Sequence, residues 1–383
     1  MSDHHHFPEE LQIEILKRLP VKSLLRFTAV SKSWYFIITS TAFISAHCRH
    51  HRNGNSAANL LLLRRYNKSY KVEKCSVLSH TDRQLLSLNN SHELSFPISR
   101  VIRYLRTVGF YNGVFCLSED QCSDPHSVTL WNPSIRKLRT LPCPSIRPAC
   151  QFRFVLGFGA SPRSDDDLKV VRVVYERKGV NLDIGPVIPP LVEIYSLSTG
   201  VWRRITAPGV NYYIVDYIWP QAFVNGAVHW IGYKLLEDKS FQSLIAVFTM
   251  TDELFDEIML PDELLSVDPS NLSVIVYEEF VAVVKYSRRI QGDSCELWIM
   301  KEYGVVDSWT KLPTIELVGG MKKLVGFREN GELLLSTKKS GLVSYCPDTR
   351  VVNDLGILGN NRSFYVHKYL GEFLVLLREQ IPL

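Results

Sequence analysis

The chain has 383 residues, of which 46% are hydrophobic and 22% charged, a balance typical of a folded globular protein. The formal net charge of +5 is small and scattered along the sequence, so it predicts no nucleic-acid partner. The longest apolar runs, such as Phe373 to Leu377, are far shorter than the ~18 residues of a spanning helix, so we expect no membrane contact.

The first ten residues contain three histidines and several acids where a secretory signal would need a basic start and an apolar run. We therefore expect no export. Eight cysteines lack close pairing motifs, which fits reduced thiols better than a disulfide framework. The expected location is the cytoplasm, with the nucleus as a second location.

Three short helices are predicted at the start of the chain. The first begins in the stretch Phe7 to Glu10, where a proline and two acids suit a first turn, and runs to Arg18 before Pro20 ends it. A second covers Lys22 to Phe27, and a third begins at Ser31, a suitable N-cap. Apolar residues recur at helical spacing at Leu11, Ile13, Ile15, Leu16, Leu19, Leu24, Leu25, Phe27, Trp34, Ile37 and Ile38.

These helices carry more apolar surface than about 40 residues can bury among themselves. Something else must cover that surface. The pattern leaves two covers open: the rest of the same chain, or a separate protein.

Residues 47–59, HCRHHRNGNSAAN, are polar and rich in turn formers, so they are predicted to be a linker. His47, Cys48, His50 and His51 raise the question of a metal site. Zinc sites usually draw paired ligands from two separated clusters, and no second His/Cys cluster of suitable spacing is present. We therefore favour a solvated helix end and predict no metal.

After Leu60 the helical period gives way to short β runs that repeat. In four segments an aromatic residue ends a strand, a polar turn follows, and an apolar residue returns about seven positions later. The anchors of these segments are Trp131, Tyr195, Phe248 and Tyr345, and Asn-Gly pairs at Asn112, Asn225 and Asn330 are predicted hairpin turns. A looser fifth copy has its anchor at Trp298. With Trp298 included, consecutive anchors lie roughly 45 to 65 residues apart, the length of one propeller blade with its loops.

The prediction is a mainly β fold with a small α N-terminal domain. A helical domain covers residues 1–46, a linker 47–59, and a β-propeller of about six blades 60–383, with the two ends of the propeller sharing one blade. The aromatic residues are expected to fill the core between blades and not to form a ligand cage; these are Trp131, Tyr195, Trp202, Phe248 and Trp298.

No group of residues indicates catalysis. Gly157-Phe158-Gly159 lacks the third glycine of a dinucleotide loop, and Asp165 to Asp167 suits a solvated turn. His229 stands alone on a predicted strand, where a hydrogen-bonded core histidine is commoner than a base. We predict that the protein is not an enzyme and needs no cofactor.

The segment FPEELQIEILKRLPVKSLLRF, followed by VSKSW, resembles an F-box, the helical module that binds the Skp-type adaptor of cullin-RING ubiquitin ligases. The resemblance spans Phe7 to about Phe43, with phenylalanine at Phe7 where leucine is usual and valine at Val30 where cysteine is common. It implies that the adaptor packs on Pro8, Leu11, Ile15, Leu16, Leu19, Pro20, Leu24, Leu25, Val30 and Trp34. The surplus apolar surface would then be an interface for another chain.

Motifs after Leu60, among them NGVFCL, LWNPSIRKLRTLP, VEIYSLSTGVWRRI and VNGAVHWIGY, resemble in order those of the plant F-box-associated interaction domain, a degenerate kelch-like propeller. The resemblance implies a substrate receptor that joins a cullin and a RING subunit through the adaptor and captures a target protein for ubiquitination. Target choice should lie on loops between strands. The candidates are the loops Glu176 to Pro190, Asn211 to Gln221 and Ser287 to Asp293. Tyr212, Tyr213 and Trp219 suit contact with a target, and packing beneath the loop is an equally good interpretation of the three residues.

Three alternatives remain open. The helices could dock on their own propeller, which would then bind a sugar or another small molecule and have no ligase role. The chain could also be an F-box protein that binds the adaptor but supports no turnover of a target. The family also includes pollen S-locus F-box proteins, so a receptor for S-ribonucleases is a third alternative. The sequence does not identify the target.

Overall fold

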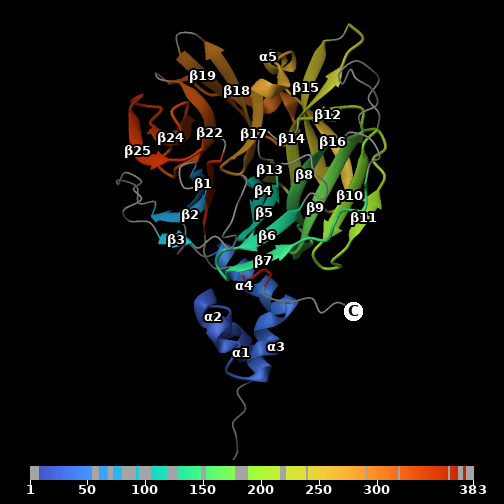
Figure 1. Cartoon of the computed structure of the whole chain (residues 1–383), viewed down its shortest axis with the longest axis vertical. Coiled ribbons are helices and arrows are strands. Elements are labelled where there is room, and N and C mark those ends of the chain that lie inside the picture. Colours follow the sequence, from blue (N-terminus) through green and yellow to red (C-terminus); the bar gives the residue numbers. More distant parts are fainter. Residues whose placement is uncertain are drawn as a thin grey trace, which may run out of the picture.

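The structure is a computed structural model of the chain (Figure 1). It describes residues 8–53, 60–67, 72–79, 92–94, 105–119, 127–147, 152–176, 189–215, 221–238, 240–289, 292–317, 320–360, 363–369 and 374–376. Within them, no helix has both the length and the apolar character needed to cross a membrane.

Helices open the described chain, and the first three follow the prediction closely. They are α1 (Glu9–Leu16), α2 (Val21–Phe27) and α3 (Lys32–Thr39). Pro8 and Pro20 directly precede α1 and α2. The predicted cap at Ser31 is confirmed, because its hydroxyl accepts a hydrogen bond of 3.1 Å from the backbone N–H of Trp34. The first helix ends at Leu16, two residues before the predicted Arg18.

A fourth helix, α4 (Thr41–Asn53), occupies the first part of the predicted linker. Phe43, Ile44, His47 and Cys48 recur at helical spacing and are buried. A linker at residues 47–53 was therefore wrong, because the histidine and the cysteine take apolar positions on the inner face of a helix. Residues 54–59 lie outside the described residues.

The described strands form six sheets, which are the blades of the predicted propeller. The first three blades contain, in order, β1 (Leu60–Asn67), β2 (Val72–Ser79), β3 (His92–Leu94) and β26 (Tyr365–Lys368); β4 (Leu105–Tyr111), β5 (Val114–Glu119), β6 (Val128–Asn132) and β7 (Lys137–Thr140); and β8 (Phe152–Ser161), β9 (Ser164–Glu176), β10 (Leu191–Ser196) and β11 (Trp202–Ile205).

The fourth and fifth blades have five strands each, and the sixth has four. They contain β12 (Tyr213–Ile214), β13 (Ala222–Val224), β14 (Ala227–Leu235), β15 (Phe241–Thr249) and β16 (Leu254–Met259); β17 (Leu272–Tyr277), β18 (Phe280–Arg289), β19 (Gly292–Met300), β20 (Trp309–Lys311) and β21 (Ile315–Leu317); and β22 (Met321–Phe327), β23 (Leu333–Thr337), β24 (Gly341–Tyr345) and β25 (Val352–Leu358). A short helix, α5 (Asp262–Leu265), and two 3-10 turns, Pro269–Asn271 and Val306–Ser308, complete the elements.

The ring closes as predicted, with the two ends of the propeller in one blade. β26 pairs antiparallel with β1, and Leu61 faces Lys368 while Arg64 faces Tyr365. At the hairpin of β4 and β5, Asn112 and Gly113 both have positive φ, of 46° and 75°. These are the dihedrals that a tight two-residue hairpin requires, and asparagine and glycine accept them most readily.

Four of the five repeated aromatic residues fill the core, as the sequence predicts, whereas the fifth, Trp202, is only half-buried. Trp131, Tyr195 and Phe248 are fully buried and Trp298 is almost so. Trp131 stacks on Phe115 with ring centroids 5.4 Å apart. These rings pack the blades, and none of the four is free to form a ligand cage.

A buried ion pair anchors the third blade. Arg172 on β9 and Glu193 on β10 are both almost completely buried, with Nη1 and Oε1 2.6 Å apart. The other carboxylate oxygen of Glu193 accepts hydrogen bonds from the backbone N–H and hydroxyl of Ser145 and from the N–H of Ile146, at 2.7–3.1 Å. The pair therefore holds the segment after the second blade against the third.

The helices and the propeller share one continuous hydrophobic core. It contains Ile38 of α3, Phe43 and Cys48 of α4, and propeller residues of the second and third blades such as Leu130 and Leu168. The segment 374–376 joins the same core beside α4 (Figure 1), and Asn132 Nδ2 donates a hydrogen bond of 2.7 Å to the carbonyl of residue 375. The helical unit is thus fixed to the propeller by packing.

Candidate protein-binding site

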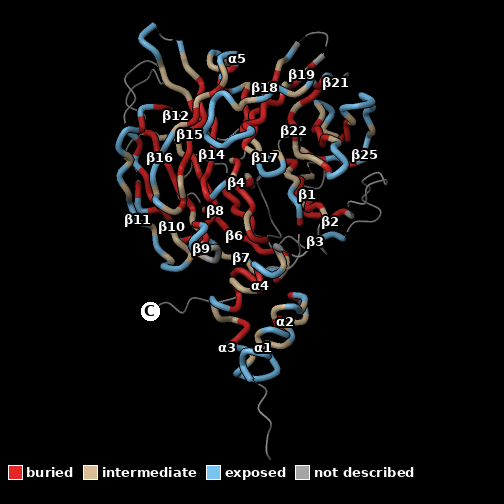
Figure 2. The backbone as a smooth tube through the Cα atoms, turned by 180° about the vertical axis from the view of Figure 1, so that it is seen from behind, coloured by how far each residue is buried: buried red, intermediate tan, exposed pale blue. Residues whose placement is uncertain are grey.

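Helices α1 to α3 extend from one end of the propeller, and much of their outer surface is exposed (Figures 1 and 2). Leu11 and Ile15 on α1 are 50% and 52% exposed, Val30 is 62% exposed, and Tyr35 and Phe36 on α3 are 50% and 68% exposed. We call these five residues the apolar helical surface. So many large apolar side chains exposed on one small unit suit contact with another protein.

The inner sides of the same helices form a small core that holds this surface in place. Leu16, Leu24 and Ile38 are almost completely buried. Trp34 connects the three helices, because its indole N–H donates a hydrogen bond of 3.0 Å to the side-chain oxygen of Gln12. Its ring also packs against that of Phe27 in an edge-type contact, with centroids 5.0 Å apart.

The ten residues predicted to contact an adaptor therefore divide into three groups. Five are exposed, namely Pro8, Leu11, Ile15, Pro20 and Val30, and three are half-buried, namely Leu19, Leu25 and Trp34. Leu16 and Leu24 are buried at 1% and 0% exposure and belong to the core of the helical unit. Direct contact through these two leucines does not fit the structure, since both already pack inside; contact through the other eight stays a prediction.

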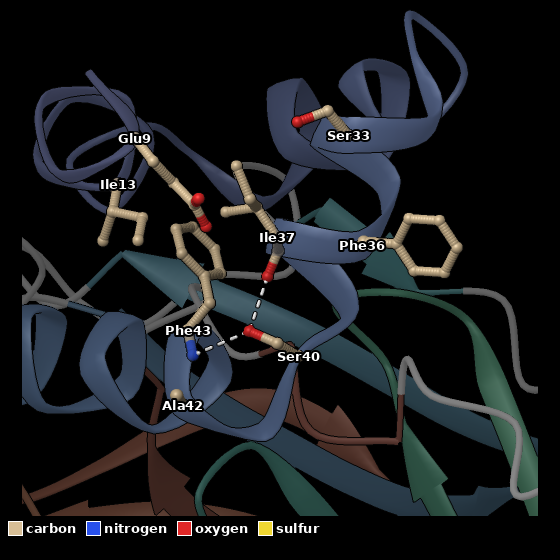
Figure 3. A pocket seen from close by; sticks show the side chains of 8 residues that line it. All are labelled: Glu9, Ile13, Ser33, Phe36, Ile37, Ser40, Ala42 and Phe43. Atoms are coloured by element: carbon tan, nitrogen blue, oxygen red, sulfur yellow. Dashed lines mark hydrogen bonds between the residues drawn. The ribbon is translucent and has the colours of Figure 1, made fainter.

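A pocket of about 370 Å³ opens between α1, α3 and α4 (Figure 3). Glu9 and Ile13 on α1 lie opposite Ile37 and Phe43, and the ring of Phe36 points away from them. The Ser40 hydroxyl closes the turn between α3 and α4, since it donates to the Ile37 carbonyl at 2.8 Å. The lining is mostly apolar with one carboxylate, so the pocket suits an apolar side chain with a positive group beside it.

Sequence analysis did not single out Tyr35 and Phe36. A signal was present, because the predicted third helix places Trp34, Ile37 and Ile38 on one face. At 100° per residue, Phe36 then points to the opposite side. Two aromatic residues on the outer side of a short helix are a sign of an interface.

Two histidines of α4 lie against the segment that connects α1 to α2. His47 is fully buried, and its Nε2 is 3.1 Å from the carbonyl oxygen of Leu19. Burial lowers the pKa of His47 to about 4, so the ring is neutral at pH 7. Burial also lowers the pKa of His51, although a hydrogen bond to the backbone of Lys17 works in the opposite direction.

The residues proposed as target contacts on the propeller are less available than predicted. Tyr212 is 3% exposed, and its hydroxyl donates a hydrogen bond of 3.2 Å to the carbonyl of Asp256. Tyr213 is half-buried among rings, 5.4 Å from Tyr175 and 5.6 Å from Tyr233 between centroids. Tyr212 is therefore a core residue and not an exposed contact, and Trp219 lies outside the described residues.

The described parts of the second and third predicted target-binding segments lie at the end of the propeller opposite the helices. In both views β12 and the ends of β18 and β19 lie at that end, beside α5 (Figures 1 and 2). The segment Ser287 to Asp293 is mostly strand and not a loop, because β18 pairs with β19 up to Arg289 and Gly292. Of the first segment, residues 177–188 lie outside the described residues.

His229 and Asp167, which were weighed above as possible catalytic or metal-binding residues, are both hydrogen-bonded to neighbouring side chains. His229 is fully buried, and its Nε2 is 2.8 Å from the hydroxyl of Tyr303. Asp167 accepts hydrogen bonds from the Ser196 hydroxyl and the Ser198 N–H. Across the described ranges, no group of three or more histidine, cysteine, aspartate or glutamate side chains is placed to hold a metal ion.

His229 makes the stability of the propeller sensitive to pH. Burial lowers its pKa to about 4, whereas an unfolded histidine has a pKa near 6.5. Its contribution is complete above about pH 6.5 and is lost as the pH falls from there towards 4, because only the unfolded chain then binds the proton. We expect about 2 kcal/mol more loss of unfolding free energy between pH 7 and pH 5 in the wild type than in His229→Gln, measured with denaturant. Equal losses in both proteins would refute this role.

Two family models match the sequence of this chain, one over the propeller and one over the N-terminal helices. A family model described as F-box associated beta propeller domain matches residues 64–372, and one described as F-box domain matches residues 5–45. The Arabidopsis thaliana F-box/kelch-repeat protein At3g23880 is 27% identical over 357 residues, which cover 90% of this chain and 89% of that protein. F-box protein CPR1 of the same plant is 25% identical over 370 residues, covering 91% and 84%.

Solved structures resemble the chain only distantly. TolB from Acinetobacter baumannii has a TM-score of 0.44 and 10% identity, over 85% of this chain and 71% of that one. This likeness is too weak to support an argument about function.

Proposed function

Since the chain belongs to the family of F-box proteins that carry an F-box associated β-propeller domain, we propose that it is the substrate-recognition subunit of a Skp–cullin–F-box ubiquitin ligase. The F-box domain and the similarity to F-box proteins support the general role of a substrate adaptor in such a complex. The finer proposal is that a Skp-type adaptor covers the apolar helical surface and that the propeller holds a target protein.

One observation carries the proposal: Leu11, Ile15 and Val30 are exposed on a unit that its own propeller does not cover. The propeller packs on α4 and leaves the outer sides of α1 and α3 uncovered. This argues against the alternative in which the helices merely dock on the propeller, since docking would bury these side chains.

The proposed mechanism is recruitment without catalysis by this chain. The adaptor would connect it to a cullin and a RING subunit, and other subunits would transfer ubiquitin to a lysine of the target. This chain would raise the effective concentration of that lysine near the conjugating enzyme. Its work would take place in the cytoplasm or the nucleus.

Reconstitution tests the proposal. The full chain is purified with a Skp-type adaptor, cullin and RING subunit, and a protein captured by the chain is incubated with them, ubiquitin and its activating and conjugating enzymes. We expect ubiquitin on the captured protein only when this chain is present. A captured protein that stays unmodified in the complete assembly would contradict the ligase role, and failure to bind the adaptor would contradict the F-box role.

A further inference from the structure

A half-buried arginine lies beside tyrosine rings at the end of the propeller away from the helices. Arg153 is the second residue of β8 and faces Tyr175, near the end of β9. Leu168, which packs in the core shared with the helices, lies seven residues earlier on β9, or roughly 23 Å away along the strand. Arg153 therefore belongs to the end of the molecule that carries β12 and not to the end that carries the apolar helical surface (Figure 1).

Two aromatic rings hold the guanidinium of Arg153. Its central carbon is 4.7 Å from the ring centroid of Tyr213 and 5.1 Å from that of Tyr175. The Tyr175 hydroxyl donates a hydrogen bond of 3.2 Å to the Tyr212 carbonyl and accepts one of 3.3 Å from the Ile214 N–H. These bonds fix β12, and with it the ring of Tyr213, against Tyr175. The arginine is thus oriented before a partner binds, which lowers the entropic cost of binding.

Arg153 differs from other arginines of the propeller in its charge pairing. Arg64 and Arg172, in the first and third blades, each form an ion pair with a glutamate, at 2.9 Å to Glu73 and 2.6 Å to Glu193. For Arg153, by contrast, no carboxylate in the described part of the chain forms an ion pair, and no oxygen there accepts a hydrogen bond from its guanidinium. A half-buried guanidinium with five N–H donors is stabilised by an anion, so a partner that supplies one would complete the pairing.

The neighbouring groups do not neutralise this charge. Burial raises the pKa of the Tyr175 hydroxyl, although the charge of Arg153 works in the opposite direction, so the phenol is neutral at pH 7. Lys234 on β14 is a second cation near this end, but it is already paired with Glu257 at 2.7 Å. The residue before it, Tyr233, adds a half-buried ring 5.6 Å from that of Tyr213.

We propose that Arg153, with the rings of Tyr213 and Tyr233, binds an aspartate or glutamate side chain of the target protein and an apolar residue next to it. This inference rests on the proposed function, because it names the class of residue by which the propeller would recognise its target. A guanidinium matches a planar carboxylate with two parallel hydrogen bonds. Arginine and tyrosine also contribute much of the binding energy at protein interfaces.

The charge of the site favours a carboxylate over a phosphoryl group. A phosphorylated residue carries nearly two negative charges and is usually bound by several arginines. Arg153 supplies one positive charge, which matches the single charge of an aspartate or glutamate. The half-buried tyrosine rings beside it suit an apolar side chain.

The test uses a random peptide library displayed on phage as the probe, selected against the full chain. We expect the selected peptides to be enriched in aspartate or glutamate beside an apolar residue. The Kd of such a peptide should rise at least about tenfold when its acid is replaced by the amide, and by a similar factor with Arg153→Gln. Both changes together should weaken binding little more than either alone, because they remove the same ion pair.

Arg288→Gln is the matched control, since Arg288 is exposed on β18 at the same end of the propeller and its loss changes the net charge equally. It should leave Kd unchanged. The comparison of the acidic peptide with its amide uses the unaltered chain, so it also covers the case in which Arg153→Gln fails to fold.

Three results would overturn the proposal: a selection without acidic peptides, equal affinity for the acidic peptide and its amide, or equal weakening by Arg288→Gln and Arg153→Gln. Tighter binding of the peptide with phosphoserine in place of its acid would assign the site to phosphorylated targets instead. Neither adaptor nor ubiquitin enters the measurement, so its failure is distinct from a failure of the ligase reconstitution.

Discussion

Ile15→Asp is expected to abolish capture of a Skp-type adaptor while leaving the chain folded. The side chain is half-exposed on α1, so a carboxylate there stays hydrated in the free protein and changes unfolding free energy by about 0.5 kcal/mol or less. In a complex the same carboxylate would be buried without a partner. Burial of this carboxylate would weaken the binding free energy by about 4 kcal/mol, which raises Kd roughly a thousandfold.

The measurement is adaptor binding by titration, with thermal unfolding recorded for the same samples. Leu358→Asp is the matched control, because Leu358 is 65% exposed on β25, far from the helices, and should bind the adaptor normally. Leu24→Asp gives the contrast of a core change, since Leu24 is fully buried and should lose folding and binding together. Normal adaptor binding by Ile15→Asp would remove α1 from the interface.

Glu193→Ala should strongly destabilise the propeller, lowering the free energy of unfolding by about 3–5 kcal/mol. The substitution leaves the buried guanidinium of Arg172 without its carboxylate. It also removes the acceptor of hydrogen bonds from Ser145 and Ile146. Denaturant unfolding followed by tryptophan fluorescence gives the value.

Glu257→Ala serves as the control for that experiment. Its ion pair with Lys234 is as close, 2.7 Å, but the two side chains are 34% and 24% exposed. Solvent screens such a pair, and its loss should cost no more than about 1 kcal/mol. Similar losses in the two variants would mean that burial does not set the strength of the Arg172–Glu193 pair. A double change, Arg172→Met with Glu193→Leu, should recover much of the stability because no buried charge is left unpaired.

The features that were predictable from sequence are those that local patterns determine. Ser31 caps a helix because its hydroxyl reaches the N–H of Trp34 whatever the rest of the chain does. The propeller follows from strands and turns that repeat at blade length, and the repeated aromatics, such as Trp131, had to be buried once blades stacked. The closure of the ring by β26 and β1 follows from the same repeat.

The features that sequence reasoning missed depend on which of two apolar faces turns inward. Leu11 and Leu16 are both apolar residues of α1, yet the first is exposed and the second buried, and only the packing of α1 on α2 and α3 decides this. The helix α4 was hidden because His47 and Cys48 occupy apolar positions. The sequence around Tyr212 suggests a surface aromatic residue, but the hydroxyl of Tyr212 donates a hydrogen bond to the carbonyl of Asp256, and this contact allows the ring to be buried.

The joint between helices and blades has a mechanical consequence. Since α4 and residues 374–376 are embedded in the same interior as the second and third blades, the two ends of the molecule cannot swing independently without exposing that interior to water. A protein bound to the helices and a protein bound to the far end of the propeller would therefore keep a constant distance and orientation relative to each other. If a group on one bound protein had to approach a distant group on the other, the movement would have to occur within those bound proteins.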